Sequence, residues 1–121
     1  MSRPRVLLAD DQVFLHSLLT RLLEPSCEVI GALTDSTELA EAIARLQPDV
    51  VVVDLNMPKL SGLEACRLIR ASTPSVQVII LTADEEPGLR ERAFSVGAAG
   101  FVRKMRAGEE LAAAVHDAVR G

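Results

Sequence analysis

The stretch Val50-Val51-Val52-Val53-Asp54 decides the fold of this chain, because four consecutive valines predict a strand that is buried on both faces. Such strands are typical of the centre of a parallel sheet, where helices cover both faces. Further short apolar runs stand at residues 6–9, 29–33, 76–81 and 100–103. The sequence therefore predicts five strands, with residues 50–53 as the central one.

Apolar residues at helical spacing fill the intervals between these strands. We expect helices over about residues 13–23, 36–46, 61–71, 86–96 and 109–119. Ser36 or Thr37 is expected to cap the second helix and Ser61 the third, while Gly97 is expected to end the fourth. Strict alternation of strands and helices predicts one doubly wound α/β domain over residues 1–121, with a parallel sheet and right-handed crossovers.

Composition and charge exclude several classes of function. The 121 residues carry a net charge of −4 and only 2% aromatic residues, so neither a basic surface nor base-stacking rings are available for nucleic acid. No apolar run has the length of a membrane span, and the N-terminal residues lead into the first strand without a signal-peptide apolar region. We therefore predict a cytoplasmic setting, in which Cys27 and Cys66 are buried or half-buried thiols and not metal ligands.

The side chains that carry chemistry stand just beyond the predicted strands, at the edge where ligands bind in sheets of this kind. Asp10 and Asp11 follow the first strand, Asp54 ends the third, and Thr82 and Lys104 follow the fourth and fifth. Clustered carboxylates repel one another strongly unless a cation joins them, and Mg2+ prefers oxygen ligands. We predict a Mg2+ site with Asp54 as the nucleophile for phosphoryl transfer, Lys104 as a fixed cation and Thr82 as a hydroxyl donor.

These positions also resemble the pattern of a known family, the receiver domain of two-component response regulators. The similar motifs are Asp10-Asp11, Asp54 with Met57-Pro58 and Gly62, Thr82-Ala83, and Phe101 three residues before Lys104. The resemblance covers essentially the whole chain. It implies a flavodoxin-like (βα)5 fold with sheet order 2-1-3-4-5.

The resemblance implies a role for each matching position. The three carboxylates match the metal-binding acids, and Asn56 matches the residue whose backbone carbonyl completes the metal shell. Asp54 matches the phospho-acceptor, and Lys104 matches the ammonium that binds the phosphoryl group. Thr82 matches a hydroxyl that moves toward that group, and Phe101 a ring that then turns inward. Together they would switch the surface of the fourth helix, fifth strand and fifth helix.

Partners follow from the same resemblance. A partner histidine kinase is expected to donate the phosphoryl group, and phosphorylation-dependent homodimers are common in families of this appearance. Residues 97–104, with Asp11-Gln12, are most similar to the subfamily with a C-terminal helix-turn-helix domain, so DNA would be bound only through a separate domain. Met105 stands where many members have Pro in a cis peptide bond, which leaves the isomer of the Lys104–Met105 bond open.

Other functions compete with this one. A phosphatase of the haloacid dehalogenase type would need a second Asp two residues after Asp54, where Asn56 stands. A receiver-shaped interaction module that no longer uses phosphate usually lacks pocket residues, and all are present here. A flavin-binding module would need a phosphate-cradling loop after the first strand and a Trp or Tyr, which the sequence lacks. His16 and His116 have no metal-ligand neighbours and are not expected to be catalytic, although an influence of His16 on access to the pocket is left open.

Overall fold

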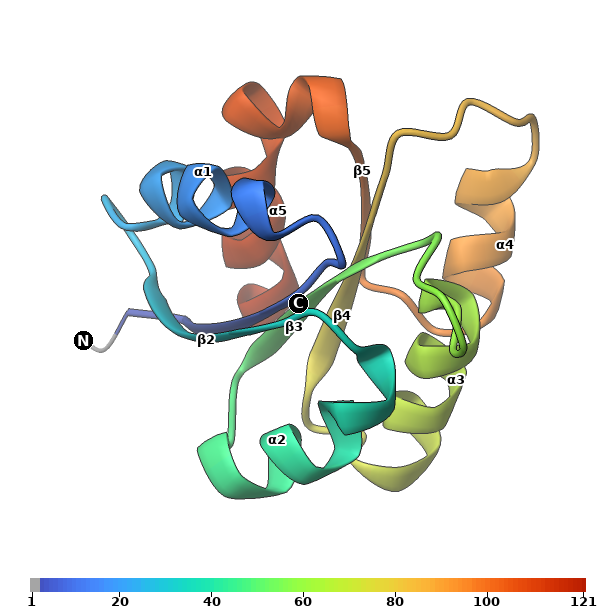
Figure 1. Cartoon of the computed structure of the whole chain (residues 1–121), viewed down its shortest axis with the longest axis horizontal. Coiled ribbons are helices and arrows are strands. Elements are labelled where there is room, and N and C mark those ends of the chain that lie inside the picture. Colours follow the sequence, from blue (N-terminus) through green and yellow to red (C-terminus); the bar gives the residue numbers. More distant parts are fainter. Residues whose placement is uncertain (1–2) are drawn as a thin grey trace.

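β3 (Val50–Asp54) lies in the middle of a five-stranded parallel sheet in the computed structural model, which describes residues 3–121 (Figure 1). Every residue of β3 is buried, as the four valines predict. The strands follow the order β2-β1-β3-β4-β5, which is the order that the resemblance implies. The remaining strands are β1 (Arg5–Ala9), β2 (Glu28–Leu33), β4 (Gln77–Thr82) and β5 (Gly100–Arg103).

Helices cover both faces of the sheet (Figure 1). One face carries α1 (Val13–Leu23) and α5 (Ala107–Arg120), and the other carries α2 (Leu39–Leu46), α3 (Gly62–Ser72) and α4 (Leu89–Ser95). Successive side chains of a strand point to opposite faces. Val50 and Val52 therefore pack with α1 and α5, while Val51 and Val53 pack with the other three helices. The doubly wound α/β arrangement is confirmed.

The second helix starts later than predicted. Ser36–Glu38 form a turn of 3-10 helix, η1, and α2 begins only after it. The carboxylate of Asp35 caps this turn by accepting the backbone N–H of Thr37 at 2.9 Å, so the prediction that Ser36 or Thr37 is the cap is wrong. The hydroxyl of the buried Ser36 instead donates to the carbonyl of Leu60, which ties the start of α2 to the loop before α3.

The fourth and fifth helices also differ from the prediction at their N-termini. α4 begins at Leu89 and not near residue 86, because Gly88 has a φ of 87°, a left-handed conformation that interrupts a helix. α5 begins at Ala107, earlier than predicted, and follows the 3-10 turn η2 (Lys104–Arg106). Gly97, with a φ of 102°, follows α4 and ends it as predicted.

α3 is anchored against the end of β3. Ser61 caps it as predicted, by accepting the backbone N–H of Glu64 at 3.2 Å. Gly62, the first residue of α3, lies so close to β3 that a Cβ there would be 2.6 Å from the carbonyl oxygen of Asp54. Because only glycine permits this approach, the start of α3 and the backbone of Asp54 determine each other's position.

The structure also answers questions about the Lys104–Met105 peptide bond, the two cysteines and membrane-spanning helices. The Lys104–Met105 peptide bond is trans, as is every peptide bond among residues 3–121. Cys27 and Cys66 are both buried, and burial raises the pKa of the Cys66 thiol to about 11, an effect that Arg70 only partly offsets. In the described part of the chain, no helix combines the length and apolar character needed to cross a membrane.

Candidate functional site

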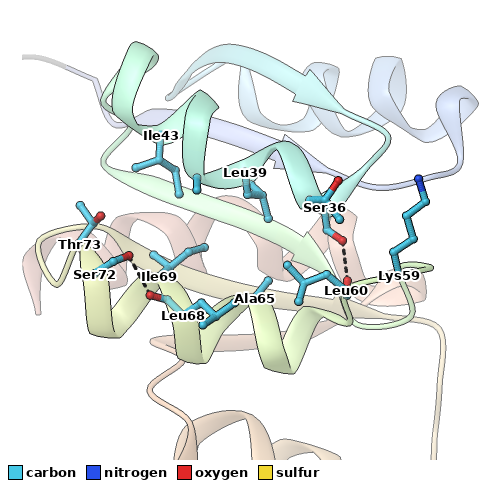
Figure 2. A pocket seen from close by; sticks show the side chains of 12 residues that line it. Ser36, Leu39, Ile43, Lys59, Leu60, Ala65, Leu68, Ile69, Ser72 and Thr73 are labelled. Atoms are coloured by element: carbon cyan, nitrogen blue, oxygen red, sulfur yellow. Dashed lines mark hydrogen bonds between the residues drawn. The ribbon is translucent and has the colours of Figure 1, made fainter.

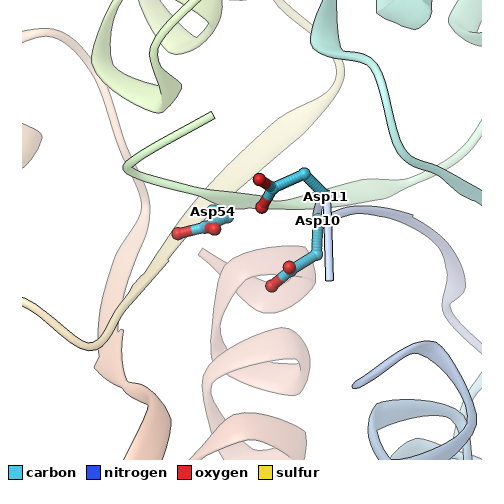
Figure 3. Close-up of side chains that lie close together, drawn as sticks. All are labelled: Asp10, Asp11 and Asp54. Carbon is cyan, nitrogen blue, oxygen red and sulfur yellow. The ribbon is translucent and has the colours of Figure 1, made fainter. Parts of the chain in front are cut away.

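Three carboxylates meet at the carboxyl ends of β1 and β3. These strands are neighbours with Ala9 paired to Val53, so Asp10 and Asp54 come next to each other at the sheet edge. Asp11 follows in the loop, and one carboxylate oxygen from each of the three lies within 4.8 Å of the others (Figure 3). The structure thus brings together the three acids that the sequence predicts to hold Mg2+, with Asp10 and Asp54 buried and Asp11 exposed.

Lys104 reaches the acidic cluster from the start of η2, directly after β5, which lies two strands away from β3. Its Nζ lies 3.0 Å from Asp10 Oδ2 and 3.3 Å from Asp54 Oδ2. It also donates a hydrogen bond to Oε1 of Gln12 at 3.0 Å, a contact that the sequence analysis missed. The only signal for Gln12 in the sequence was its place directly after Asp11.

Burial and charge oppose the ionisation of Asp54. Burial raises the pKa of its carboxyl, and the negative charge of Asp10 adds to this effect. The backbone N–H of Asn56, which donates to Oδ1 at 3.2 Å, and the Lys104 ammonium act in the opposite direction. Three carboxylates facing one ammonium leave two surplus negative charges, which suits a divalent cation.

One buried oxygen supports a metal site independently. Asp10 Oδ2 has no hydrogen-bond donor among the residues that the structure describes, since Lys104 Nζ approaches it at ion-pair distance without hydrogen-bond geometry. A buried carboxylate oxygen without a hydrogen-bond donor is costly, and the single charge of Lys104 is shared between the two buried carboxylates that it faces. The donor set of three carboxylates therefore fits Mg2+, and the contribution of the Asn56 carbonyl stays a prediction.

Thr82 and Phe101 lie on the strands beyond β3. Thr82 ends β4, is fully buried, and accepts the backbone N–H of Asp84 on its Oγ1 at 2.8 Å. Phe101 on β5 is 4% exposed, and the guanidinium carbons of Arg90 and Arg103 lie 5.3 and 5.7 Å from its ring centroid. The ring is already buried, so an inward turn of the kind that the resemblance implies would have to start from another conformation.

An apolar groove of about 520 Å³ lies away from this cluster, between α2 and α3 (Figure 2). Leu39 and Ile43 line it from α2, and Ile69 lines it from α3. Lys59 at its edge is paired with Asp35 at 3.1 Å. None of the described residues that line the groove carries a carboxylate, thiol or imidazole.

Comparison with known proteins agrees with this geometry. Residues 6–116 match the family described as response regulator receiver domain. The chain is 39% identical over 113 residues to protein-glutamate methylesterase/protein-glutamine glutaminase 2 of Koribacter versatilis, covering 88% of this chain and 30% of that protein. It is 32% identical over 119 residues to response regulator GacA of Pseudomonas aeruginosa, covering 97% of this chain and 56% of GacA. The structure matches the signal receiver domain of the putative response regulator NarL from Mycobacterium tuberculosis with a TM-score of 0.92 at 29% identity, covering 100% and 99% of the two chains.

These likenesses extend over nearly all of this chain but over less than two thirds of either longer relative. The matched part of this chain contains the parallel sheet in the order β2-β1-β3-β4-β5 and, at its edge, the three carboxylates, two of which face Lys104. Sequence match, sheet order and site geometry lead to one conclusion: the chain belongs to the receiver domain family of two-component response regulators.

Proposed function

We propose that this chain is a phosphorylation switch, in which Asp54 accepts a phosphoryl group from a histidine kinase in a Mg2+-dependent reaction. Receiver domains of response regulators act in signalling and interact with histidine kinases. The observation that carries the proposal for this chain is the buried Asp54 carboxylate, 3.3 Å from Lys104 Nζ and beside the carboxylates of Asp10 and Asp11. A carboxylate held in this way is a suitable phosphoryl acceptor.

The residues around Asp54 would position the reacting groups. Asn56 N–H holds Oδ1 and Lys104 approaches Oδ2, so the carboxylate is oriented before a donor arrives. In the transfer, an Asp54 oxygen bonds to phosphorus while the N–P bond of the donor phosphohistidine breaks, and the leaving imidazole takes a proton from water. Lys104 would neutralise a phosphoryl oxygen. Mg2+, held by Asp10, Asp11 and Asp54, supplies further charge neutralisation when bound.

Thr82 would connect phosphorylation to the surface of α4, β5 and α5. Its Oγ1 now accepts the N–H of Asp84, and donating its hydroxyl to a phosphoryl oxygen would require it to leave this bond. Asp84 belongs to the segment that leads into α4, and its carbonyl also accepts a hydrogen bond from Arg103 of β5 at 2.6 Å. A movement of Thr82 would therefore disturb the contacts between this segment and the surroundings of Phe101.

An exposed apolar surface beside the site supports a protein partner for the transfer. Val13 and Phe14 at the start of α1 are 65% and 72% exposed, and Leu18 on the next turn is 51% exposed. Met105, directly after Lys104, is 79% exposed. Large exposed apolar side chains on the segments that follow Asp11 and Lys104 favour an interaction surface. We infer that the histidine-bearing domain of the kinase docks here, because its phosphohistidine must reach Asp54.

The chain would work as one unit of a longer regulator. We infer that residues 1–121 form one receiver domain that operates in the cytoplasm, where a kinase can reach it. Both curated relatives are longer than this chain, and one of them, GacA, is a response regulator. The resemblance to the helix-turn-helix subfamily implies that DNA is bound by a separate C-terminal domain, with a phosphorylation-dependent homodimer bringing two copies together.

The proposal is tested by intact mass after incubation with acetyl phosphate and Mg2+. The wild type should gain one phosphoryl group, the Asp54→Asn variant none, and the gain should disappear when EDTA removes Mg2+. No gain in the wild type under any condition would refute the switch and would favour a phosphate-independent interaction module.

A further inference from the structure

Nearly all polar atoms of Asp10 have a hydrogen-bond partner. Its N–H donates to the carbonyl of Leu33 at 2.9 Å, and its Oδ1 accepts the N–H of Gln12 at 2.8 Å. Its carbonyl oxygen lies 2.7 Å from Nε2 of His16. Only Oδ2 has no hydrogen-bond partner in residues 3–121, apart from the nearby charge of Lys104. The surroundings thus leave one atom of Asp10 available for a metal ion.

The hydrogen bond of His16 joins its side chain to the backbone of Asp10, a residue six positions earlier in the sequence. His16 lies in the first turn of α1, and its ring reaches back to Asp10, the residue that follows β1. Because a carbonyl oxygen only accepts hydrogen bonds, Nε2 of His16 must carry the proton and donate it. The ring therefore closes the loop that contains Asp11, from the end of β1 to the start of α1.

Apart from Asp10 Oδ1, which accepts the N–H of Gln12, no described side chain other than His16 ties the loop to the start of α1. Gln12 stands at the N-cap but makes no side-chain cap hydrogen bond, and the first turn contains no acidic residue. Gln12 uses its side-chain oxygen for Lys104 instead. The imidazole of His16 thus ties the helix to the loop by donating to a loop carbonyl, which differs from a cap residue that accepts a helix N–H.

We propose that His16 is a positioning residue for the metal site. By donating to the Asp10 carbonyl, it fixes the backbone from which Oδ2 of Asp10 and the carboxylate of Asp11 extend. Groups behind the metal ligands commonly determine how well a site is organised before the ion binds. The inference rests on the proposed function, since it concerns the carboxylates that hold Mg2+ for the transfer to Asp54.

The test compares His16→Leu, which removes the donor, with His16→Gln, whose side-chain amide offers an N–H. Ser17→Ala, at an exposed neighbouring position on α1, is the control. The dissociation constant of Mg2+ is measured from amide chemical shifts in each 121-residue protein. We expect about a 10-fold weaker affinity in His16→Leu, within the usual range for loss of a group behind a metal ligand, and less than about 3-fold in His16→Gln.

Two further readouts separate positioning from a general loss of stability. Amide exchange of Asp11 and Gln12 in EDTA should become faster in His16→Leu, while exchange in the central strand β3 stays unchanged. Saturating Mg2+ should restore phosphorylation of His16→Leu by acetyl phosphate. Equal Mg2+ affinity in His16→Leu and wild type, or equal weakening by Leu and Gln, would overturn the role of His16. If the wild type itself shows no Mg2+-dependent shifts, the proposed function fails, and this inference fails with it.

Discussion

The substitution Gly62→Ala tests how closely the start of α3 and the position of Asp54 depend on each other. A Cβ at residue 62 would lie 2.6 Å from the Asp54 carbonyl oxygen and 2.8 Å from Leu55 Cα. Ordinary contact begins at 3.4 Å, so backbone atoms of β3 or α3 must move, and no flexible side chain is available to give way. Overpacking of this kind costs about 1–3 kcal/mol of the free energy of unfolding.

Gly62→Ala should affect the rate of phosphorylation more strongly than the free energy of unfolding. Asp54, whose carboxylate we propose to be the phosphoryl acceptor, is the same residue whose backbone would be displaced. A misplacement near 1 Å can lower a rate by about 100-fold. We therefore expect Gly62→Ala to fold but to accept a phosphoryl group from acetyl phosphate at least about 10-fold more slowly than the wild type.

A matched control is available in α5. A Cβ on Gly108 would meet only Leu22 Cδ2 at 3.9 Å, which is ordinary contact. Gly108→Ala should therefore stabilise the protein by up to about 1 kcal/mol through helix propensity, without changing phosphorylation. Urea unfolding and intact-mass kinetics are measured for both variants. If Gly62→Ala unfolds like the wild type and is phosphorylated at the same rate, the steric reasoning is wrong.

Further predictions concern the charges and the surfaces of the site. Asp54→Asn should gain stability over the wild type in EDTA as the pH rises above about 4. Below that value the wild-type carboxyl is protonated in both states, whereas above it the unfolded carboxyl ionises while the raised pKa keeps the folded one protonated, so the wild type loses stability until the pH passes the folded pKa. A pH-independent difference in urea unfolding would contradict this. Lys104→Met removes the cation that faces Asp10 and Asp54, so Mg2+ should raise its thermal unfolding temperature more than that of the wild type, whereas equal shifts would argue against the charge balance. Thr82→Ala should leave Asp54 phosphorylatable but weaken phosphorylation-driven dimerisation in light scattering, and unchanged coupling would count against the route through Thr82. Phe14→Ala should slow transfer from a histidine kinase that phosphorylates the wild type while leaving the acetyl phosphate rate unchanged; equal slowing with both donors would exclude docking on α1.

The local pattern of residues in the sequence was sufficient to predict the strands and helices of the fold. Four valines before Asp54 mark a strand buried on both faces, and the period of two along it divides the core between the two helical layers. The same alternation of strands and helices explains why the acids meet, since the carboxyl ends of parallel strands share one edge. Element ends were less predictable, because the Asp35 side chain caps η1 and the left-handed backbone of Gly88 delays the start of α4, and propensity specifies neither.

Periodicity alone does not specify which strands are neighbours; the family resemblance implied the order and the structure confirmed it. The sheet order puts β1 beside β3 and thereby Asp10 beside Asp54, and it sets how far Lys104 must reach to face both. The sequence by itself determined the strands, the helices and the set of acids, because these follow from interactions between residues close in the chain. Only the tertiary structure decided the contacts of Gln12 with Lys104, of His16 with the Asp10 carbonyl and of Gly62 with Asp54. Such contacts depend on packing and side-chain rotamers in three dimensions, and no local pattern of residues encodes them.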